Sequence, residues 1–429
     1  MLPSARNGFA AGAAPAAEGG APAGATCVGQ GGSSARAAGN MPPSETTITI
    51  QNGLERAMKS GIIMARHARA PRKTPTLHML ETDARVALIR DWLARELRRP
   101  AARIEPASSD ASFRRYFRVF CRDATYVVMD APPGKEDVRP YLKVSRLLES
   151  LGAHVPHVHA SDVERGLLLL EDLGATLYLE RLEAGDDPER LYADALGVLA
   201  TIQVRGGAAG AQLAPYGRAE LLREMALMPQ WFLDRHLALT RAADEARLID
   251  TAFEFLIAEA LAQPVVFVHR DYHARNLMVV KERNPGIIDF QDALRGPVGY
   301  DLVALLKDCY IAWPRARVVG WVSGYRELLR SQGGPAGESE QQFLRWFDLI
   351  GVQRHIKVLG IFCRLWYRDG KPGYLPDLPR TLEYVRDACA RYAELGALGS
   401  FLERRVLAQL PRANARVSAG LKRAADTRT

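Results

Sequence analysis

Residues 265–301 decide the fold of this chain. They read Val265-Val-Phe-Val-His-Arg-Asp-Tyr-His-Ala-Arg-Asn-Leu-Met-Val-Val280, then Gly286-Ile-Ile-Asp-Phe-Gln-Asp292, then Gly296-Pro-Val-Gly-Tyr-Asp301. Short apolar runs alternate with polar loops, a pattern typical of a hairpin-rich unit of short strands. Because each run leads into polar residues, two carboxylates and one amide oxygen can meet at one edge of this unit.

Four polar residues in this stretch have the spacing that phosphoryl transfer from ATP requires. His269, Asp271 and Asn276 have the His-x-Asp-x-x-x-x-Asn spacing of a kinase catalytic loop, and Asp289 follows the second apolar run. Mg²⁺ prefers oxygen ligands, so Asn276 and Asp289 are the candidate metal ligands, with ATP and Mg²⁺ as the expected cofactors. Asp271 remains as the candidate base, and His269 as a structural support of the loop. The alternative is that these residues have no catalytic function, since a lone His-x-Asp arises by chance and an Asp often just forms a turn.

These motifs resemble the aminoglycoside phosphotransferase and choline kinase superfamily. The resemblance rests on His269-Arg-Asp-Tyr-His-Ala-Arg-Asn276, Ile288-Asp-Phe-Gln-Asp292 and Gly296-Pro-x-x-x-Asp301, and it covers about residues 79–400. The longer string from Asp289 to Pro314 resembles one subgroup, the anomeric sugar kinases that act on N-acetylmuramate and N-acetylglucosamine in bacterial cell-wall recycling. The resemblance implies an α+β, protein-kinase-like fold with a small antiparallel β lobe and a larger, mainly helical lobe.

The resemblance also implies an activity. It implies an ATP- and Mg²⁺-dependent kinase that transfers the γ-phosphate to a sugar hydroxyl, most specifically the anomeric hydroxyl of N-acetylmuramate or N-acetylglucosamine. Two alternatives stay open: a kinase for an aminoglycoside or an amino alcohol, and a non-catalytic nucleotide-binding pseudokinase. A protein kinase is disfavoured, because Asp289-Phe-Gln replaces Asp-Phe-Gly and no Ala-Pro-Glu segment follows.

The positive charge of the chain lies at its two ends. The formal net charge is +8, but the first 78 residues hold eight Lys or Arg against three Asp or Glu, and the last 29 hold seven against two. The near-neutral body does not favour a nucleic-acid partner, and no apolar run reaches the roughly 18 residues of a membrane span. Five scattered cysteines without Cys-x-x-Cys spacing fit reduced thiols. These features favour a cytoplasmic protein, which we expect to be a monomer. The resemblance implies a small amino-sugar substrate.

Four segments are expected along the chain. Residues 1–78, Ala- and Gly-rich at first and basic at their end, form a disordered or mis-assigned extension, with Met79 as an alternative start and a transit peptide as a third interpretation. Residues 79–171 form the small lobe with a leading helix and a phosphate loop. Residues 172–410 form the helical lobe, and 411–429 a frayed basic tail.

The small lobe carries the expected nucleotide contacts. Ser108, Ser109 and Asp110 form a small-residue turn whose backbone N–H groups can approach phosphate oxygens. By resemblance, Glu171 and Leu173 belong to the hinge, where main-chain groups meet adenine; the plainer interpretation of this stretch is a strand-to-helix turn.

The chain lacks one lysine of the kinase pattern. A lysine that binds the α- and β-phosphates is expected near Met129, and none is present; the following helix also lacks an early glutamate partner. The basic residues that can replace this charge are Arg114, Arg115, Arg118 and Lys135, and we assign Arg115 to the nucleotide site. If none replaces the lysine, the pseudokinase alternative gains weight.

The acceptor site is expected beyond the metal aspartate and on the helix predicted over residues 340–367. The candidate substrate-binding residues are Arg275, Asp292, Asp308 and Arg364. Cationic groups of this region, which include Arg354 and Lys357, could meet the lactyl carboxylate of N-acetylmuramate. The plainer interpretation is that a long helix shows several charges to solvent.

Asp301 has a different expected role. It lies in an apolar helical stretch, so a buried carboxylate there needs hydrogen-bond donors. We predict that it accepts hydrogen bonds from the backbone N–H groups near His269 and Arg270, and thereby supports the loop.

Overall fold

The computed structural model describes residues 83–97, 103–109 and 113–426, within the compact unit Arg69–Thr429. The predictions for the N-terminal extension and for Asp110 fall outside the described residues.

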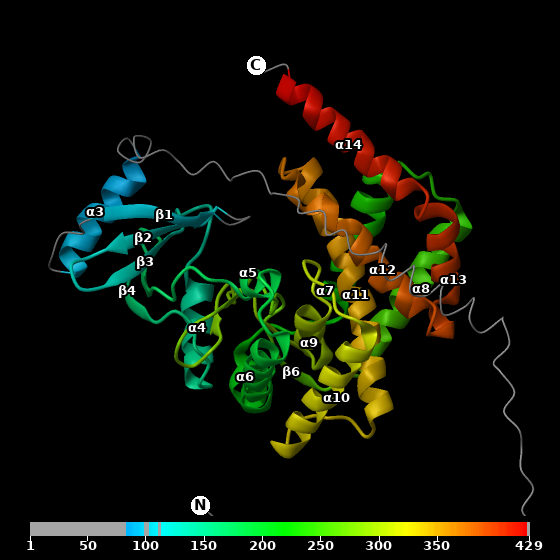
Figure 1. Cartoon of the computed structure of the whole chain (residues 1–429), viewed down its shortest axis with the longest axis horizontal. Helices are drawn as coiled ribbons and strands as arrows, with labels where there is room; N and C mark the ends of the chain where they lie inside the picture. Colours follow the sequence, from blue (N-terminus) through cyan, green and yellow to red (C-terminus); the bar gives the residue numbers. More distant parts are fainter. Residues whose placement is uncertain (1–82, 98–102, 110–112, 427–429) are drawn as a thin grey trace, which may run out of the picture. The chain divides into compact units, whose positions relative to one another are not determined.

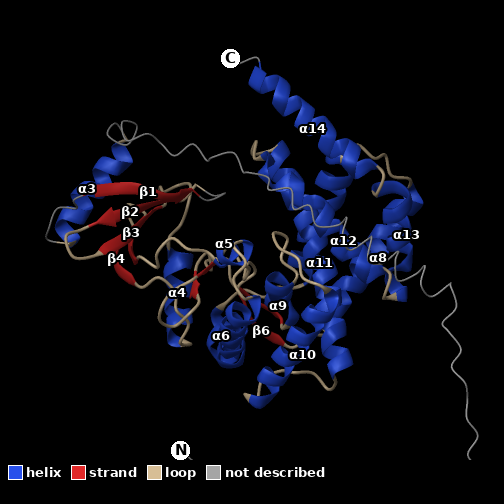
Figure 2. Cartoon of the chain, in the orientation of Figure 1, coloured by secondary structure: helices blue, strands red, loops and turns tan. Residues whose placement is uncertain are grey.

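A five-stranded antiparallel sheet forms the small lobe, with the strand order β1-β2-β3-β5-β4 (Figure 2). Its strands are β1 (Arg103–Ser109), β2 (Arg115–Phe120), β3 (Thr125–Asp130), β4 (Val158–Asp162) and β5 (Leu167–Glu171). Two helices accompany it, α3 (Ala84–Glu96) and α4 (Arg139–Ser150) (Figure 1).

The two faces of this sheet belong to different cores. Val128 of β3 packs in a small apolar cluster with the α3 residues Ile89 and Trp92, whereas the next residue, Met129, packs in the main core with Tyr141 of α4. Successive side chains of a strand point to opposite faces, so the alternating pattern places α3 and α4 on opposite sides of the sheet.

The rest of the described chain is mainly helical. Its helices and helical turns are α5 (Tyr178–Glu183), α6 (Pro188–Ala209), η1 (Gly210–Gln212), α7 (Arg218–Met225), η2 (Met228–His236), α8 (Ala243–Leu261), α9 (Gly299–Leu306), α10 (Arg315–Ser331), α11 (Glu340–Tyr367), η3 (Pro372–Asp377), α12 (Leu378–Cys389), η4 (Ala393–Leu395), α13 (Gly396–Phe401), η5 (Leu402–Val406) and α14 (Gln409–Asp426). The small antiparallel sheet and the larger helical part confirm the predicted fold class.

Four short strands within residues 265–301 form two antiparallel pairs. β6 (Val265–Val268) pairs with β9 (Leu294–Pro297), and β7 (Leu277–Met278) pairs with β8 (Gly286–Ile287). The loop with Asp271 therefore joins β6 to β7, and the loop with Asp289 joins β8 to β9.

This hairpin unit also contacts the small lobe. The ring centroids of Tyr141 on α4 and Phe290 lie 4.7 Å apart, and the Ile287 N–H donates to the His154 carbonyl at 2.8 Å. The position of α4 is thus linked to the segment that carries Asp289.

The C-terminal prediction needs correction. The frayed tail expected after Leu410 is instead the helix α14, which continues to Asp426. Leu410 and Ala413 are 3% and 1% exposed, so an apolar contact holds the first turns of this helix.

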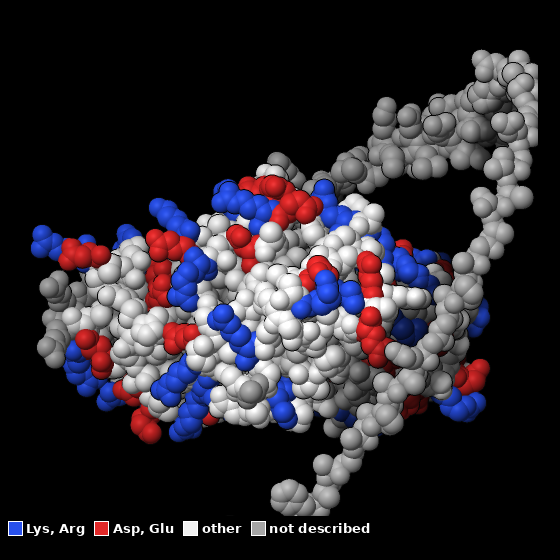
Figure 3. Space-filling view, turned by 90° about the horizontal axis from the view of Figure 1, so that it is seen from below, with Lys and Arg blue, Asp and Glu red and all other residues white. Residues whose placement is uncertain are grey.

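Acidic and basic side chains are intermingled on the face shown in Figure 3. This mixture agrees with the near-neutral body of the chain. In the described residues, no helix is long and apolar enough to cross a membrane.

Glycines on α11 permit its close packing, and Gly360 gives a direct test. A β-carbon at Gly360 would lie 2.3 Å from the carbonyl carbon of Leu227, just before η2, so Gly360→Ala forces the two elements apart. We expect overpacking to lower the free energy of unfolding by about 1–3 kcal/mol, measured by urea denaturation.

Gly324→Ala on α10 is the matched control: no described atom lies within 4 Å of its β-carbon position. Its better helix propensity should leave stability equal or up to about 1 kcal/mol higher. Equal stability of the two variants would contradict this packing account.

Candidate active site

A buried carboxylate holds the loop between β6 and β7. Asp301 on α9 has no exposed surface and accepts hydrogen bonds from the backbone N–H groups of His269, at 2.6 Å, and Arg270, at 3.0 Å. Both hydrogen bonds predicted for Asp301 are therefore present. Burial raises the pKa of the Asp301 carboxyl to about 7, although the two backbone hydrogen bonds act to lower it.

The residue after His269 has an unusual backbone conformation. Arg270 has a φ of 80°, in the left-handed region that side chains other than glycine rarely adopt. Because Asp301 binds two successive N–H groups, those of His269 and Arg270, the carboxylate can compensate for the strain. The turn directs Asp271 away from the apolar core, and the Asp271 side chain is 47% exposed.

His269 connects this loop to the loop with Asp289. Its side chain is 2% exposed, and its Nε2 lies 3.1 Å from the Ile288 carbonyl. Its Nδ1 accepts a hydrogen bond from the Asp271 N–H at 3.3 Å, so Nε2 carries the proton that is donated to Ile288. Burial lowers the pKa of His269 to about 4, and the imidazole is therefore neutral at pH 7. This arrangement fits the support role expected for His269.

Asn276 and Asp289 lie side by side. The Asn276 amide donates to the Asp271 carbonyl at 3.0 Å and lies 3.5 Å from Asp289 Oδ2. Asp289 itself has a φ of 64°, a conformation that aspartate tolerates better than most residues. The neighbouring Gln291 donates to Asp289 Oδ1 at 2.8 Å, and its own amide oxygen is buried without a hydrogen-bond partner in the described residues.

This set of oxygen donors fits Mg²⁺. Carboxylate and amide oxygens are the protein ligands that Mg²⁺ prefers, and the unpartnered Gln291 oxygen adds polar surface beside them. No cluster of three His, Cys, Asp or Glu suited to a metal occurs in the described ranges. A cation held by Asn276 and Asp289 would therefore complete its shell with water and phosphate oxygens, as Mg²⁺ commonly does.

Positive charges surround Asp271. Partial removal from water acts to raise the pKa of its carboxyl, but the charges of Lys357, Arg354 and Arg270 outweigh this effect and hold the pKa below its usual value. Arg354 makes the ion pair with Asp271, with 3.6 Å between Nη2 and Oδ1. The candidate base is thus ionised at neutral pH.

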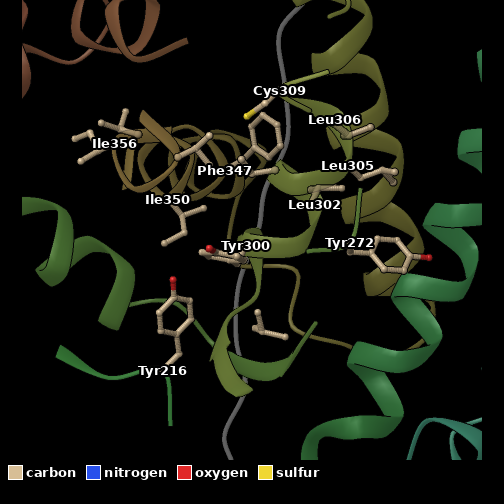
Figure 4. Close-up of a cluster of buried hydrophobic side chains, with 14 of the residues drawn as sticks. Tyr216, Tyr272, Tyr300, Leu302, Leu305, Leu306, Cys309, Phe347, Ile350 and Ile356 are labelled. Atoms are coloured by element: carbon tan, nitrogen blue, oxygen red, sulfur yellow. The ribbon is translucent and has the colours of Figure 1, made fainter. Parts of the chain in front are cut away.

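A buried acid on α7 joins two of these cations. Glu224 is 2% exposed, and its carboxylate lies 2.9 Å from Lys357 Nζ and also pairs with Arg270 and with the Tyr216 hydroxyl. The Lys357 ammonium donates to the Tyr300 hydroxyl at 3.0 Å. The rings of Tyr216 and Tyr300 meet edge to face, with their centroids 5.1 Å apart, in the apolar cluster of Figure 4. Sequence reasoning missed Glu224, because an acid on an amphipathic helix looks like a solvent-facing residue.

The predicted acceptor residues fall into different environments. Asp308 is 1% exposed, and its oxygens accept hydrogen bonds from the N–H groups of Ala274 and Tyr310. Burial raises its pKa to about 6. Within the described residues no ion pair joins Asp308 to Arg364, which is half-buried on α11. The structure thus does not pair these two candidates with each other, and Asp308 contacts the Asp271 loop instead.

The other two acceptor candidates lie nearer solvent. The Arg275 guanidinium lies over the Tyr310 ring, 4.6 Å from its centroid. Asp292 is exposed and lies 3.5 Å from the Gln291 amide, one residue from the Asp289 site. Their roles in acceptor binding stay predictions.

Arg115 lies in an ion-pair network with α3. Its guanidinium is 2.5 Å from Asp83 and 2.6 Å from Asp130, and Arg85 binds the same Asp130 carboxylate. Asp130 has no exposed surface. Arg115 therefore attaches α3 to the sheet, and this placement gives no support to the nucleotide contact assigned to it.

The remaining candidate cations have separate partners. Arg118 makes two hydrogen bonds to Asp172, at 2.8 and 3.0 Å, and Lys135 lies 5.2 Å from the Phe113 ring centroid. Burial raises the pKa of Tyr141 on α4, and the charge of Arg114 acts to lower it. The replacement of the missing lysine by one of these cations stays a prediction.

The predicted phosphate turn begins later than expected. Ser108 and Ser109 belong to β1 and pair with Tyr116 and Arg115 of β2, because the β1–β2 ladder extends through them with one irregularity. At the hinge, Glu171 accepts a hydrogen bond from the His157 N–H at 3.2 Å. Leu173 packs against β8: a β-carbon at Gly286 would lie 2.8 Å from its Cδ1.

A sheet-and-helix fold with an Asp271 loop beside an Asn276–Asp289 pair defines a protein-kinase-like phosphotransferase. The chain belongs to the phosphotransferase enzyme family, whose sequence model matches residues 103–340. It is 44% identical over 334 residues to the N-acetylmuramate/N-acetylglucosamine kinase of Pseudomonas putida, covering 76% of this chain and 97% of that protein. It is 48% identical over 303 residues to the protein of the same name from Pseudomonas aeruginosa, covering 71% and 88%.

A solved structure supports the fold. The choline kinase of Streptococcus pneumoniae matches with a TM-score of 0.53 and 14% identity, covering 72% of this chain and all of that one. These findings confirm the resemblance drawn from the motifs, and they identify the chain as a phosphotransferase.

The support from Asp301 can be tested by Asp301→Asn. The variant leaves an NH₂ group facing a backbone N–H, and one buried donor loses its acceptor. We expect the free energy of unfolding to fall by about 1–3 kcal/mol. Because displacement of a catalytic group by 1 Å can cost about 10²-fold in rate, kcat should fall by about that factor. Urea denaturation and steady-state kinetics measure the two effects. Asp387→Asn, on the surface of α12, is the control; a wild-type kcat in Asp301→Asn would refute the support role.

Proposed function

We propose that this chain is an ATP- and Mg²⁺-dependent kinase that phosphorylates the anomeric hydroxyl of N-acetylmuramate or N-acetylglucosamine. One observation carries the chemistry: the half-exposed, ionised Asp271 lies on a loop whose Asn276 is 3.5 Å from Asp289. A base and a pair of metal-type oxygen ligands on neighbouring rigid turns are what phosphoryl transfer requires.

In the proposed reaction, Asp271 orients the sugar hydroxyl and accepts its proton. The bond from the γ-phosphorus to the bridging oxygen breaks, with its electron pair left on ADP, and a bond from phosphorus to the sugar oxygen forms. Asn276 and Asp289 would hold Mg²⁺, which would neutralise charge on the phosphates. Anomeric hydroxyls are more acidic than ordinary alcohols, so a carboxylate whose pKa is held low by Lys357 and Arg354 is still an adequate base.

The choice of acceptor rests on the relatives. The relatives from two Pseudomonas species are named kinases for both amino sugars, and this chain covers 97% and 88% of their lengths. With such acceptors, the chain would serve the re-use of cell-wall sugars. The hinge from Glu171 to Leu173 is the proposed adenine site.

The acceptor can be tested directly. We would measure Mg²⁺-dependent ADP release from ATP with N-acetylmuramate, N-acetylglucosamine, kanamycin, choline and no acceptor. Turnover on the two N-acetyl sugars, well above the rate without acceptor, is the expected result. Turnover on kanamycin or choline alone would overturn the acceptor class, and ATP binding without any turnover would favour the pseudokinase alternative.

The roles proposed for the two aspartates predict different defects when each is replaced by alanine. Asp271→Ala should lower kcat by about 10²–10⁴-fold, the typical contribution of a general base, while Mg·ATP affinity stays within about threefold. Asp289→Ala should instead weaken Mg²⁺-dependent ATP binding, measured by isothermal titration calorimetry. Loss of ATP binding in Asp271→Ala, or unchanged Mg²⁺-dependent affinity in Asp289→Ala, would contradict the respective role.

A further inference from the structure

Arg354 on α11 is a buried cation with few polar contacts in the described part of the chain. It is 3% exposed, and its Nε is buried with no partner. Its one ion pair in the described part of the chain is with Asp271, and the 3.6 Å separation is longer than a hydrogen bond. A guanidinium has five donors, and buried donors in proteins are nearly always satisfied. The guanidinium also lies 5.9 Å from the centroid of the Tyr300 ring, a cation–π distance. Among the described residues, however, Asp271 is the one anionic partner in reach, and the buried Nε has no acceptor.

The other nearby acids do not supply further partners. Glu224 already receives Lys357, Arg270 and the Tyr216 hydroxyl. Both oxygens of Asp301 accept hydrogen bonds from backbone N–H groups of the Asp271 loop. Asp308 accepts one from the same loop and one from the turn after α9. Within the described residues, Arg354 is thus left with the Tyr300 ring and a long contact to one carboxylate, whereas Lys357 on the same helix pairs with Glu224 and the Tyr300 hydroxyl.

A buried charge with so few partners is costly, and an apolar side chain of similar size would often stabilise the fold better. Such a residue is expected where a ligand provides the missing counter-charge. The ligand must bring oxygen atoms close to Asp271, because Arg354 makes its ion pair there and the Asp271 carboxylate is half-exposed.

We propose that Arg354 is a catalytic arginine that binds the oxygen atoms of the phosphoryl group during its transfer from ATP to the sugar. The inference rests on the function proposed above. As the bond to ADP breaks and the bond to the sugar oxygen forms, the phosphoryl oxygens remain negatively charged, and the guanidinium supplies donors and positive charge. The hydroxyl proton still passes to Asp271.

The distances allow this contact. A hydroxyl hydrogen-bonded to Asp271 lies about 2.7 Å from its carboxylate, and the attacked phosphorus lies about 3–3.5 Å from that hydroxyl. The Arg354 guanidinium is 3.6 Å from the same carboxylate. Hydroxyl, phosphoryl group and guanidinium can therefore gather around Asp271 with a small movement of one arginine side chain.

The alternative ligand for Arg354 is the carboxylate of the acceptor sugar. N-acetylmuramate carries a lactyl carboxylate, but N-acetylglucosamine is uncharged. A cation reserved for that group would be unpaired whenever the neutral sugar is bound, whereas the phosphoryl group is present in every turnover. The phosphoryl group is therefore the ligand that we assign to Arg354.

The test compares Arg354→Gln and Arg354→Met with Arg345→Gln. Arg345 is on the same helix, but its guanidinium pairs with Glu259 and Glu394 at 2.6 and 2.8 Å near the surface, so its loss should leave catalysis unchanged. We would measure kcat and KM for both sugars, the melting temperature, and the affinity for ADP·Mg²⁺ with and without aluminium fluoride, which mimics the transferring phosphoryl group.

We expect both Arg354 variants to lose about 10³-fold or more in kcat with either sugar, while each KM changes by less than about threefold. Aluminium fluoride should strengthen ADP binding to the wild type and to Arg345→Gln, but not to the Arg354 variants. The melting temperature of Arg354→Met should equal or exceed that of the wild type, because a buried charge with few partners has been removed.

Three results would overturn the proposal. They are a retained kcat in Arg354→Gln, a loss confined to the KM for N-acetylmuramate, and a lower melting temperature with loss of ADP binding. The second would assign Arg354 to the acceptor carboxylate, and the third to folding. If the wild type phosphorylates neither sugar, the proposed function fails, but the aluminium fluoride comparison still decides whether Arg354 binds a phosphoryl mimic.

Discussion

The hydrogen bonds from His269 and Arg270 to the buried Asp301 carboxylate are the constraint on which the site depends. They fix two successive peptide groups, including the left-handed turn at Arg270 that directs Asp271 outward. His269 extends the constraint to the second loop through its hydrogen bond to Ile288. The candidate base and the candidate metal ligands thus lie on loops that are held by hydrogen bonds between buried side chains and the backbone. Such preorganisation is what a reaction driven by positioning and electrostatics requires.

The helix α11 makes the second contribution, because it is both a core element and a source of charge. Its apolar residues pack against α9 and η2, yet Arg354 and Lys357 place two buried cations behind the loop. Lys357 is neutralised by Glu224, which also holds Arg270. The cost of burying these charges argues for a functional reason, since buried ion pairs seldom stabilise a fold more than apolar packing does. Around Asp271 they keep the carboxylate ionised and make the site favourable for anions.

Much of this architecture could be predicted from the sequence, where a local pattern has one structural meaning. The spacing from His269 to Asp301 implied the paired strands and loops, because each apolar run is long enough for one short strand. The bounds predicted for α11 match the structure, since its apolar periodicity runs unbroken between a Ser cap and a Gly turn. Long-range partners could not be predicted: nothing in the local sequence shows that Glu224 turns inward to two cations, or that Arg115 pairs with Asp83 and Asp130. Nor does a basic, Ala-rich C-terminus reveal the apolar contact that keeps α14 helical.

The proposed reaction has one defining product, an amino sugar that carries phosphate on its anomeric oxygen. The most direct measurement is the ³¹P NMR spectrum of the product formed from ATP, Mg²⁺ and N-acetylmuramate by the full chain. The account predicts a phosphorus resonance that couples to the anomeric proton, and a product that is stable in alkali but hydrolysed in acid. Coupling to a proton on any other carbon, or the absence of a sugar phosphate while ATP is bound, would contradict it.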